Sequence, residues 1–333
     1  MSQPKVRVGL IAASRVARRR FLPALQQAGN ARLVRIGSRD PAKAAELAAA
    51  FGAARAGSYE DVLADPEVDA VYISTPPSLH DEWVRKAALA GKHILCEKPA
   101  FTSYRTAVEL TELCRTRGVR LMEGYMFRQH PRHAVVSSLL PRLGSPRVVH
   151  AEWTFPQPPP GDVRLQPDLG GGVFTDAGGY PLAAALLYIK SAPISVSSHA
   201  VLDSVTGVEH AVSFQIQFAS GELAQGLVAY GLRYRARYVL FCARGWVEID
   251  RAFSIESDAA SAVVFETEAG PERITVDPAD QFRLMIEAFA AQITGAAPRH
   301  DFEGELVRQH QLMDAIRRAF LERRVVSLDE NFV

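Results

Sequence analysis

The stretch VRVGLIAASRVA, residues 6–17, decides the fold class that we predict for this chain. Its first six residues are mostly aliphatic, as in a buried strand, and residues 15–27 continue as a helical pattern. A strand that runs through a short turn of small residues into a helix opens a dinucleotide-binding fold. In that alignment Ala12, Ser14 and Ala17 occupy the three places of the glycine motif, and only Ala17 is a usual choice.

The turn after this strand has two interpretations. Backbone amides at the start of a helix can bind a pyrophosphate, and small residues allow the close approach, although they leave less room than glycine does. A dinucleotide would then contact Ala12, Ala13, Ser14, Arg15 and Val16. The same residues also suit a strand–helix turn that binds nothing, so the turn alone does not decide between the two.

The end of the second predicted strand carries residues that distinguish NAD from NADP. Ser38, Arg39 and Asp40 follow the turn by about twenty residues, where NAD enzymes usually have an acid and NADP enzymes an arginine for the 2′-phosphate. A hydroxyl from Ser38 and the guanidinium of Arg39 can hold a phosphate, and Lys43 adds charge. We therefore expect NADP(H) to be favoured over NAD(H). Asp40 as a ribose-binding acid and Arg39 as a solvated loop charge remain alternatives.

The first third of the chain alternates strand and helix signals. Strand-like runs recur between helical patterns of 10–15 residues, which is typical of βαβ units and a parallel sheet. The predicted strands are residues 6–11, 33–36, 69–74, 93–96 and 119–122, and the predicted helices are residues 15–27, 41–51, 79–89 and 105–117. We predict an α/β fold with a Rossmann domain, a doubly wound parallel sheet, over residues 1–125.

The second half changes character. Residues 212–218 alternate strictly between apolar and polar side chains, and residues 223–230, 238–242 and 246–249 continue as short strands. This pattern predicts antiparallel strands with one covered face. Two helical segments follow, over residues 280–293 and 302–322. We predict an α+β domain with a large, mostly antiparallel open sheet over residues 126–333, with a role in substrate binding and oligomerisation.

The composition excludes several classes of protein. The chain has 333 residues, 48% of them hydrophobic, and 38 basic against 37 acidic residues give a net charge of +1, without the basic surplus of a nucleic-acid binder. The three cysteines form no C-x-x-C pair, and His130 and His133 have no matching carboxylates or thiolates, so we expect no metal site. No apolar run is long enough for a signal peptide or a membrane span, so we expect a cytoplasmic protein.

A first group of chemical residues follows the predicted strand at residues 93–96. Glu97, Lys98 and Pro99 stand directly after this strand, and ligands of open α/β sheets bind outside the carboxyl ends of the strands. Lys98 would then face the ligand. A solvated surface lysine is the alternative that the motif alone leaves open.

A second group lies in the segment GGGVFTDAGGYP, residues 170–181. Asp176 and Tyr180 are four residues apart and share one face if the segment is helical. Pro181 suits the first turn of a helix, so we expect Tyr180 near a helix start, where the dipole favours phenolate character. The alternatives are that Asp176 caps a helix and that Tyr180 is a packed core aromatic.

The order of these motifs resembles the Gfo/Idh/MocA oxidoreductase family over nearly the whole chain. Four pieces carry the resemblance, and they are the turn at residues 9–17, Thr75-Pro76-Pro77 with His80, Glu97-Lys98-Pro99, and the triple glycine followed by Asp176 and Tyr180. The resemblance implies a Rossmann domain followed by an open α/β domain whose sheet often makes a dimer contact. We therefore expect a homodimer or homotetramer, with no nucleic-acid or membrane partner.

The same resemblance assigns roles to residues. Lys98 would be the catalytic lysine, Asp176 a substrate-binding acid, and Tyr180 the proton donor or acceptor in hydride transfer with a nicotinamide cofactor. The remaining cofactor contacts would come from two segments, namely Thr75, Pro76, Pro77 and His80, and Glu97 with Lys98.

Tyrosine at position 180 is similar to a branch of the family that contains sugar ketoreductases. Further similarity, in residues 18–25 and 250–253, points to nucleotide-sugar 3-ketoreductases. We expect reduction of a C3 keto group on a nucleotide-linked ketosugar. The alternatives are an aldose or dihydrodiol dehydrogenase of the same family and a non-catalytic, cofactor-sensing regulator.

Overall fold

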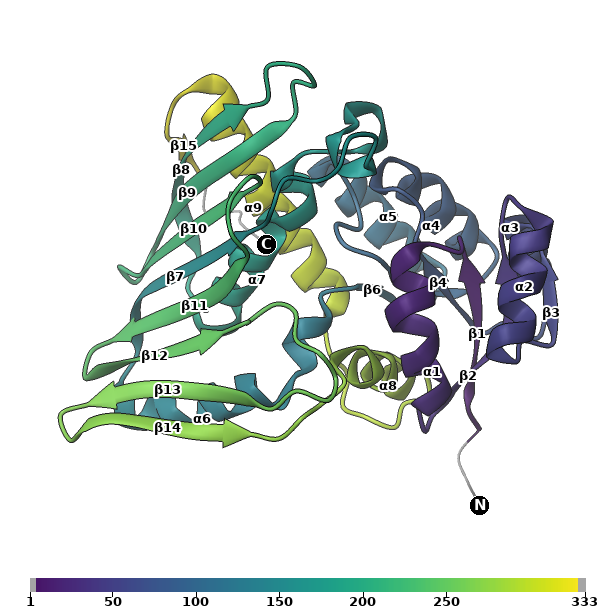
Figure 1. Ribbon diagram of the computed structural model, residues 1–333, viewed down its shortest axis with the longest axis horizontal. Coiled ribbons are helices and arrows are strands. Elements are labelled where there is room, and N and C mark those ends of the chain that lie inside the picture. The colour runs from purple at the N-terminus through teal and green to yellow at the C-terminus, as the bar shows by residue number, and fades with distance from the viewer. Residues whose placement is uncertain (1–3, 329–333) are drawn as a thin grey trace. The chain divides into compact units, whose positions relative to one another are not determined.

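The computed structural model describes residues 4–328. The chain forms two compact units, drawn in Figure 1 with the chain coloured from purple at its start to yellow at its end. The first unit runs to Met126 and takes in Asp280–Val307, and the second contains Phe127–Ala279 and the chain from Arg308 onward. The division into domains at residue 125 stays a prediction.

The first unit holds a six-stranded parallel sheet in the order β3-β2-β1-β4-β5-β6. The order reverses direction at β1 and β4, as in a Rossmann sheet, so the predicted parallel sheet is confirmed. Its strands are β1 (Val6–Ile11), β2 (Ala31–Gly37), β3 (Arg55–Gly57), β4 (Ala70–Ile73), β5 (His93–Cys96) and β6 (Leu121–Glu123).

Several helices of this unit begin at a residue whose side chain caps the helix. Asp40 accepts hydrogen bonds from two amides at the start of α2, Ser58 and Asp61 form a reciprocal capping box on α3, and Ser103 caps α5. A π-type turn at Ala17–Phe21 leads into the first helix. The helices are α1 (Leu22–Gln27), α2 (Pro41–Phe51), α3 (Tyr59–Ala64), α4 (His80–Leu89), α5 (Tyr104–Thr116) and α8 (Gln281–Ile293).

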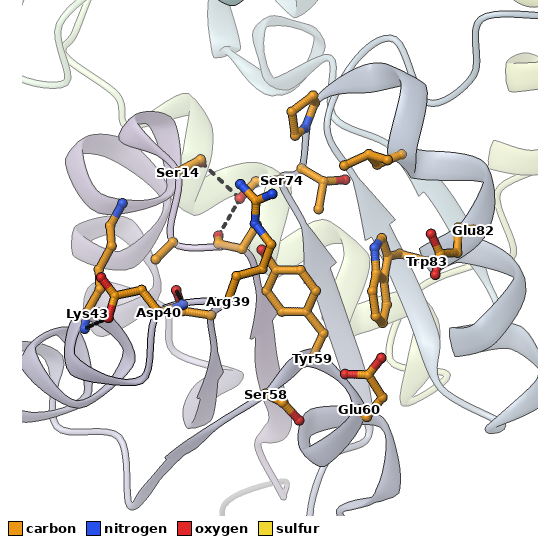
Figure 2. A pocket seen from close by; sticks show the side chains of 16 residues that line it. Ser14, Arg39, Asp40, Lys43, Ser58, Tyr59, Glu60, Ser74, Glu82 and Trp83 are labelled. Carbon is orange, nitrogen blue, oxygen red and sulfur yellow. Dashed lines mark hydrogen bonds between the residues drawn. The ribbon is translucent and has the colours of Figure 1, made fainter. Parts of the chain in front are cut away.

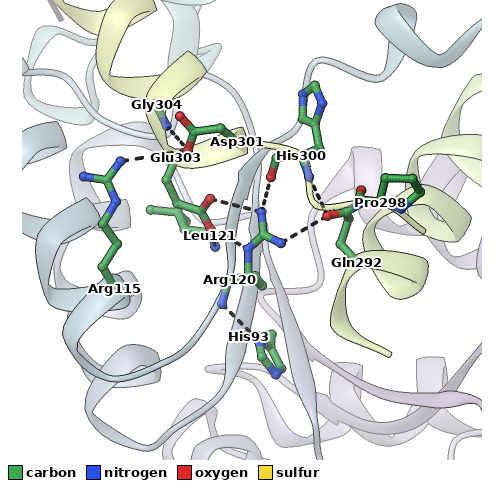
Figure 3. A network of polar contacts seen from close by, with 10 residues as sticks. All are labelled: His93, Arg115, Arg120, Leu121, Gln292, Pro298, His300, Asp301, Glu303 and Gly304. Atoms are coloured by element: carbon green, nitrogen blue, oxygen red, sulfur yellow. Dashed lines mark hydrogen bonds and ion pairs between the residues drawn. The ribbon is translucent and has the colours of Figure 1, made fainter. Parts of the chain in front are cut away.

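A polar network fastens residues 280–307 to the first sheet (Figure 3). Arg120, just before β6, donates from Nε to Glu303 at 2.8 Å and from Nη1 to Gln292 at 3.2 Å. Its Nη2 donates to the His300 carbonyl at 2.5 Å, and Glu303 also accepts from the Leu121 amide at 3.0 Å. Glu303 is almost fully buried, so this ion pair holds together segments that lie 183 residues apart.

The second unit holds a nine-stranded sheet in the order β14-β13-β12-β11-β7-β10-β9-β8-β15. Neighbours are antiparallel except β7 and β10, which pair in parallel. The prediction of a large, mostly antiparallel sheet is therefore confirmed. Its strands are β7 (Pro146–Thr154), β8 (Pro193–Leu202), β9 (Glu209–Phe218), β10 (Leu223–Ala229), β11 (Arg235–Cys242), β12 (Gly245–Asp250), β13 (Ser261–Thr267), β14 (Gly270–Val276) and β15 (Val326–Ser327).

One face of this sheet is covered and the other is open. Along β9 the buried residues Val212, Phe214 and Ile216 alternate with exposed polar ones, as the strict alternation in the sequence predicts. The helices α6 (Pro131–Leu143) and α7 (Gly179–Tyr188) pack on the sheet, and Ser198 of β8 donates to a carbonyl of α9 (Phe302–Glu322). Among residues 4–328, no helix is both long and apolar enough to cross a bilayer.

Candidate functional site

A pocket of about 560 Å³ opens at the carboxyl ends of β1, β2 and β4 in the first unit (Figure 2). Its volume lies in the usual range for cofactor sites, and the edge of the sheet where it lies is the one that binds ligands in open α/β folds. The lining residues are Ala12, Ala13, Ser14, Ser38, Arg39, Asp40, Lys43, Ser58, Tyr59, Glu60, Ser74, Thr75, Pro76, Leu79, Glu82 and Trp83.

The rim of the pocket at the end of β2 is cationic. Arg39 and Lys43 both line it, and the Arg39 side chain extends past the ring of Tyr59 in Figure 2. Burial raises the pKa of the Tyr59 hydroxyl, and the charge of Arg39 beside it acts in the opposite direction. Asp40 uses Oδ1 to accept from the Ala42 and Lys43 amides at 3.0 and 3.3 Å. This capping role accounts for the acid next to Arg39 without a ribose contact.

Two aromatic residues form a wall that the sequence did not reveal. Tyr59 of α3 and Trp83 of α4 meet edge to face with their ring centroids 4.8 Å apart, and both line the pocket. They lie 24 residues apart in the sequence and on different helices, so only the folded chain brings them together. The capping box at Ser58 and Asp61 was the sequence signal that could have located α3 and hence Tyr59.

The pocket fits a phosphorylated dinucleotide. Thr75 Oγ1 is buried and has no hydrogen-bond partner within residues 4–328. Because Thr75 lines the pocket, this hydroxyl is available to form a hydrogen bond with a ligand. Ser38, Arg39 and Lys43 supply a hydroxyl and two cations at one end of the same pocket, which suits a phosphate group. The small residues Ala12, Ala13 and Ser14 form the wall next to the start of the first helix.

Lys98 stands directly after β5 on a loop that buried groups hold in place. The Glu97 carboxylate accepts from the Tyr72 hydroxyl and, at 3.3 Å, from the Lys98 amide. Burial raises the pKa of Glu97, while the Tyr72 hydrogen bond and the Lys98 charge act in the opposite direction. On the other side of the loop, Glu123 accepts from the Ala100 amide at 2.8 Å. The backbone around Lys98 is therefore fixed at both ends.

His80 connects this loop with the loop after β4. Its Nδ1 lies 2.9 Å from the Pro99 carbonyl oxygen and its Nε2 lies 2.8 Å from the Thr75 carbonyl oxygen. The ring is only 1% exposed, and its burial lowers the pKa of His80 although these carbonyls favour the charged form. Both ring nitrogens contact backbone carbonyl oxygens of the protein. His80 therefore contributes to the pocket by positioning the backbone of Thr75, which lines it.

Asp176 lies in the second unit on a π-type turn at Phe174–Gly178. Tyr230 is the residue after β10, and its hydroxyl donates a hydrogen bond to Asp176 Oδ2 at 3.2 Å. Burial and the Asp176 carboxylate both raise the pKa of Tyr230, so this hydroxyl keeps its proton and remains a donor. Arg164 adds positive charge near Asp176, and its hydrogen bonds to Asp162 raise the pKa of Arg164.

Tyr180 is held in an aromatic cluster of the second unit. The Trp153 ring meets it edge to face at 4.2 Å between centroids, and the rings of Phe127 and Phe253 lie at 5.7 and 5.5 Å. Only 2% of Tyr180 is exposed. The packing fixes the orientation of the phenol ring, and it gives the ring a structural role beside any chemical one.

Tyr180 is the second residue of α7, near a helix start as expected, although the π-type turn at Phe174–Gly178 leads into α7 without a break. The backbone is helical throughout residues 173–188, and it changes from the π type to the α type at Gly179. Pro181 lacks an amide hydrogen and its ring would clash with the carbonyl four residues earlier in a regular helix. The π-type turn at Phe174–Gly178 widens the helix there and removes this conflict. A Cβ at Gly178 would lie 2.3 Å from the Phe174 ring, so this turn needs glycine.

Comparison with known proteins is consistent with this fold and site. A family described as "Oxidoreductase family, NAD-binding Rossmann fold" matches residues 6–125, and the GFO/IDH/MocA C-terminal domain matches residues 141–248. The chain belongs to the Gfo/Idh/MocA oxidoreductase family. The resemblance stated from the motifs is thereby confirmed, and the protein is an oxidoreductase of a family that acts on keto and hydroxyl groups.

Several relatives of this Gfo/Idh/MocA protein align over nearly their full length. A dTDP-3,4-didehydro-2,6-dideoxy-alpha-D-glucose 3-reductase from Saccharopolyspora spinosa is 35% identical and covers 94% of this chain and 97% of its own. A D-xylose 1-dehydrogenase (NADP(+)) from Haloferax volcanii is 34% identical over 96% and 99% of the two chains. The crystal structure of a 3-ketoreductase from Actinomadura kijaniata, in complex with NADP and TDP-benzene, is 32% identical and aligns with a TM-score of 0.90 over 95% and 98%.

The structure of this Gfo/Idh/MocA oxidoreductase gathers some predicted cofactor residues and leaves others apart. Eight of them line the pocket, namely Ala12, Ala13, Ser14, Ser38, Arg39, Lys43, Thr75 and Pro76. Six lie outside its lining, namely Arg15, Val16, Pro77, His80, Glu97 and Lys98. Of these, His80 and Glu97 engage the backbone of neighbouring residues. Sequence reasoning missed Ser58, Tyr59, Glu60, Ser74, Leu79, Glu82 and Trp83.

Proposed function

We propose that this protein is an NADP(H)-dependent reductase of a C3 keto group on a nucleotide-linked ketosugar. The main observation in favour of NADP(H) is that Ser38, Arg39 and Lys43 lie together at one end of the pocket. Their hydroxyl group and two positive charges suit a 2′-phosphate. A relative that reduces a dTDP-ketosugar at C3 supports the substrate class, and a similar structure holds NADP and a TDP compound. The cofactor would lie along the small-residue wall at Ala12 and Ser14.

Three side chains carry the proposed chemistry. When bound, the nicotinamide supplies the hydride. Lys98, after β5, stabilises the negative charge that develops on the carbonyl oxygen during reduction. Tyr180 delivers a proton to that oxygen, with its ring oriented by Trp153. Asp176, held by the Tyr230 hydroxyl, orients a substrate hydroxyl.

Oxidation of a free aldose is the second candidate function. The NADP(+)-dependent D-xylose dehydrogenase relative favours it, since its identity is close to that of the ketosugar reductases. The same cofactor pocket serves both reactions, so the distinction depends on the substrate. A nucleotide-linked sugar brings a diphosphate and a base, whereas a free aldose brings only hydroxyl groups.

A thermal-shift screen followed by turnover measurements tests the proposal. A ligand that binds the native state raises the melting temperature by mass action. We expect NADPH to raise it more than NADH at equal concentration, and a dTDP-ketosugar to drive NADPH consumption. Turnover of D-xylose with NADP⁺ and none with the ketosugar would favour the second candidate. Cofactor binding without turnover of any sugar would contradict both reactions and favour a cofactor-sensing regulator.

The proposal also includes a homodimer or homotetramer, which the family resemblance implies. Analytical ultracentrifugation at micromolar concentration measures this directly. A monomer over the whole concentration range would contradict it without bearing on the reaction.

A further inference from the structure

A chain of hydrogen bonds crosses the turn that follows β1, and Figure 2 shows its bond between Ser14 and Ser74. The Ala17 amide donates to Ser14 Oγ at 3.1 Å, and Ser14 Oγ donates to Ser74 Oγ at 2.9 Å. Ser74 Oγ in turn donates to the Ala12 carbonyl oxygen at 2.8 Å. Ser14 and Ser74 both line the pocket, and Ser74 follows the neighbouring strand β4. We call these three bonds the serine relay.

The relay has one consistent direction. Each hydroxyl accepts one hydrogen bond and donates the next, so both serine protons are committed and the last of them ends on a carbonyl oxygen, which can only accept. Hydrogen bonds aligned head to tail strengthen one another. Removal of either hydroxyl therefore weakens the hold on the Ala12 carbonyl.

The hydrogen bond to the Ala12 carbonyl oxygen matters because the backbone of Ala12 is strained. Ala12 has φ of 74°, a left-handed backbone conformation that is unfavourable for a residue with a Cβ. Glycine adopts this conformation without that penalty, and glycine is the usual first residue of a dinucleotide-binding turn. Here alanine occupies that place, so contacts elsewhere must stabilise the conformation. The Ala12 amide donates to the Gly37 carbonyl at 3.2 Å, and the serine relay holds the other side of the residue.

We propose that Ser14 and Ser74 are positioning residues that hold this glycine-free turn in the shape required to bind the cofactor's pyrophosphate. The proposal rests on the cofactor binding of the proposed function. Ser14 fixes the start of the helix by accepting from Ala17, and Ser74 fixes Ala12 from the tip of β4. Two hydroxyls from separate segments thereby replace what a glycine does through its own backbone freedom.

A rescue experiment tests the proposal. Ser74→Ala removes the bond to the Ala12 carbonyl, so we expect the Kd for NADPH, from fluorescence titration, to rise about tenfold. Ala12→Gly removes the need for that bond. In the Ala12→Gly background we expect Ser74→Ala to raise the Kd by less than about threefold. An equal rise in both backgrounds would show that Ser74 contacts the cofactor directly, and no rise in either would show that the relay has no role. Either result would overturn the proposal.

Melting temperatures without cofactor separate this proposal from the proposed function. We expect Ser74→Ala to lower the melting temperature, and Ala12→Gly to reduce that loss by at least half. Ser103→Ala is the matched control, because it removes a helix cap on α5 outside the pocket, and its loss should be the same in both backgrounds. If the wild-type protein binds neither NADPH nor NADH, the proposed function fails, while rescue in melting temperature would still support the relay's hold on the turn. Rescue in melting temperature without rescue in Kd would overturn the role in cofactor binding.

Discussion

The cofactor pocket and the Asp176–Tyr180 segment build their sites in different ways. The pocket gathers polar and cationic side chains at strand ends, with Arg39 and Lys43 exposed at its rim. Tyr180 instead lies inside a helix, is 2% exposed, and packs against Trp153. At the exposed rim of the pocket, then, the proposed recognition residues are separate from the residues that stabilise the fold. In the second unit the residue proposed to transfer the proton is also a packed core residue.

This difference has a consequence for mutagenesis. A substitution at the pocket rim removes a contact with the ligand and leaves the core intact. A substitution in the aromatic cluster alters packing at the same time, so only a change confined to the reacting atom is informative there. The four predictions below test the contrast, beginning with the largest expected effect.

Tyr180→Phe tests whether chemistry and packing can be separated in the cluster. The change deletes one hydroxyl and keeps the ring against Trp153, so turnover should fall by ~10²–10⁴-fold, the usual range for general acid–base catalysis. The melting temperature should change little. Steady-state kinetics with NADPH and differential scanning fluorimetry measure the two effects.

Tyr188→Phe on the same helix is the matched control. Its hydroxyl lies 2.7 Å from the Tyr238 hydroxyl in the buried core, so its loss should lower stability and leave turnover of the folded protein unchanged. If Tyr180→Phe behaves like this control, Tyr180 is a core residue and the proposed proton transfer is wrong.

Lys98→Met tests the role of the lysine loop. The loop is held by Glu97 and Glu123 through backbone amides, and Lys98→Met leaves these hydrogen bonds in place. Loss of one electrostatic stabiliser should lower kcat by ~10²–10³-fold, with the Kd for NADPH nearly unchanged. Lys5→Met, at the other end of the sheet, serves as the control and should keep wild-type kinetics. Near-wild-type kcat in the Lys98 variant would contradict a catalytic role.

Arg39→Ala tests the cationic rim. A hydrogen bond to a charged group is worth about 1.5–3 kcal/mol, so NADPH should bind roughly 10- to 100-fold more weakly. NADH lacks the 2′-phosphate and should bind almost as before. Isothermal titration calorimetry measures both, and Arg105→Ala, an exposed arginine on α5 that does not line the pocket, provides the control. An equal loss for both cofactors would rule out phosphate recognition by Arg39.

Acid should destabilise the second unit through its buried histidines. Burial lowers the pKa of His130 to about 4 and that of His133 well below its usual value. The unfolded chain takes up these protons near pH 6.5, and the folded chain does so only near the lowered pKa. Stability is therefore full above about pH 6.5 and is lost as the pH falls toward 4. The loss from His130 alone is about 2 kcal/mol between pH 7 and pH 5.

His130→Asn checks this assignment. Asparagine can still accept the capping hydrogen bond from the Arg132 amide, but it does not titrate. Urea unfolding at pH 5 and pH 7 should show a smaller pH dependence than in the wild type, by about one proton. An unchanged pH dependence would place the acid sensitivity elsewhere.

Prediction from the sequence succeeded where local signals are strong. The strand at Val6–Ile11, the helix at Pro41–Phe51 and the helix at Phe302–Glu322 have clear periodicity or caps, and the structure confirms their bounds. It failed for β3 and α3, because three- and six-residue elements carry too little pattern and form through packing against their neighbours. The aromatic wall was missed because Tyr59 lies on α3, for which the capping box was the available sequence signal, and because nothing in the sequence shows that Trp83, on the predicted helix at residues 79–89, faces Tyr59.

Some residues of the candidate site could be predicted from the sequence, and others could not. The positions of Ser38 and Arg39 follow from their place at a strand end and that of Thr75 from the family resemblance, and the structure places all three in one pocket. Ser74 could not be found in this manner, since its role depends on a bond to Ala12, 62 residues away. The π-type turn before Tyr180 was equally hidden, because the sequence does not show that the Phe174 ring packs where a Cβ at Gly178 would lie.

The return of residues 280–307 to the first unit constrains how this protein can be recombined with its relatives. The chain enters the first unit twice, and α9 belongs to it up to Val307 and to the second unit from Arg308. A chimera joined only at residue 125 would pair Arg120 with a foreign partner in place of Glu303, and would replace Leu306 in the core cluster that also contains Leu121 of β6. A chimera that exchanges the nucleotide-binding unit should therefore have three junctions, near residues 126, 280 and 307. Residues 280–307 should come from the same protein as the N-terminal segment.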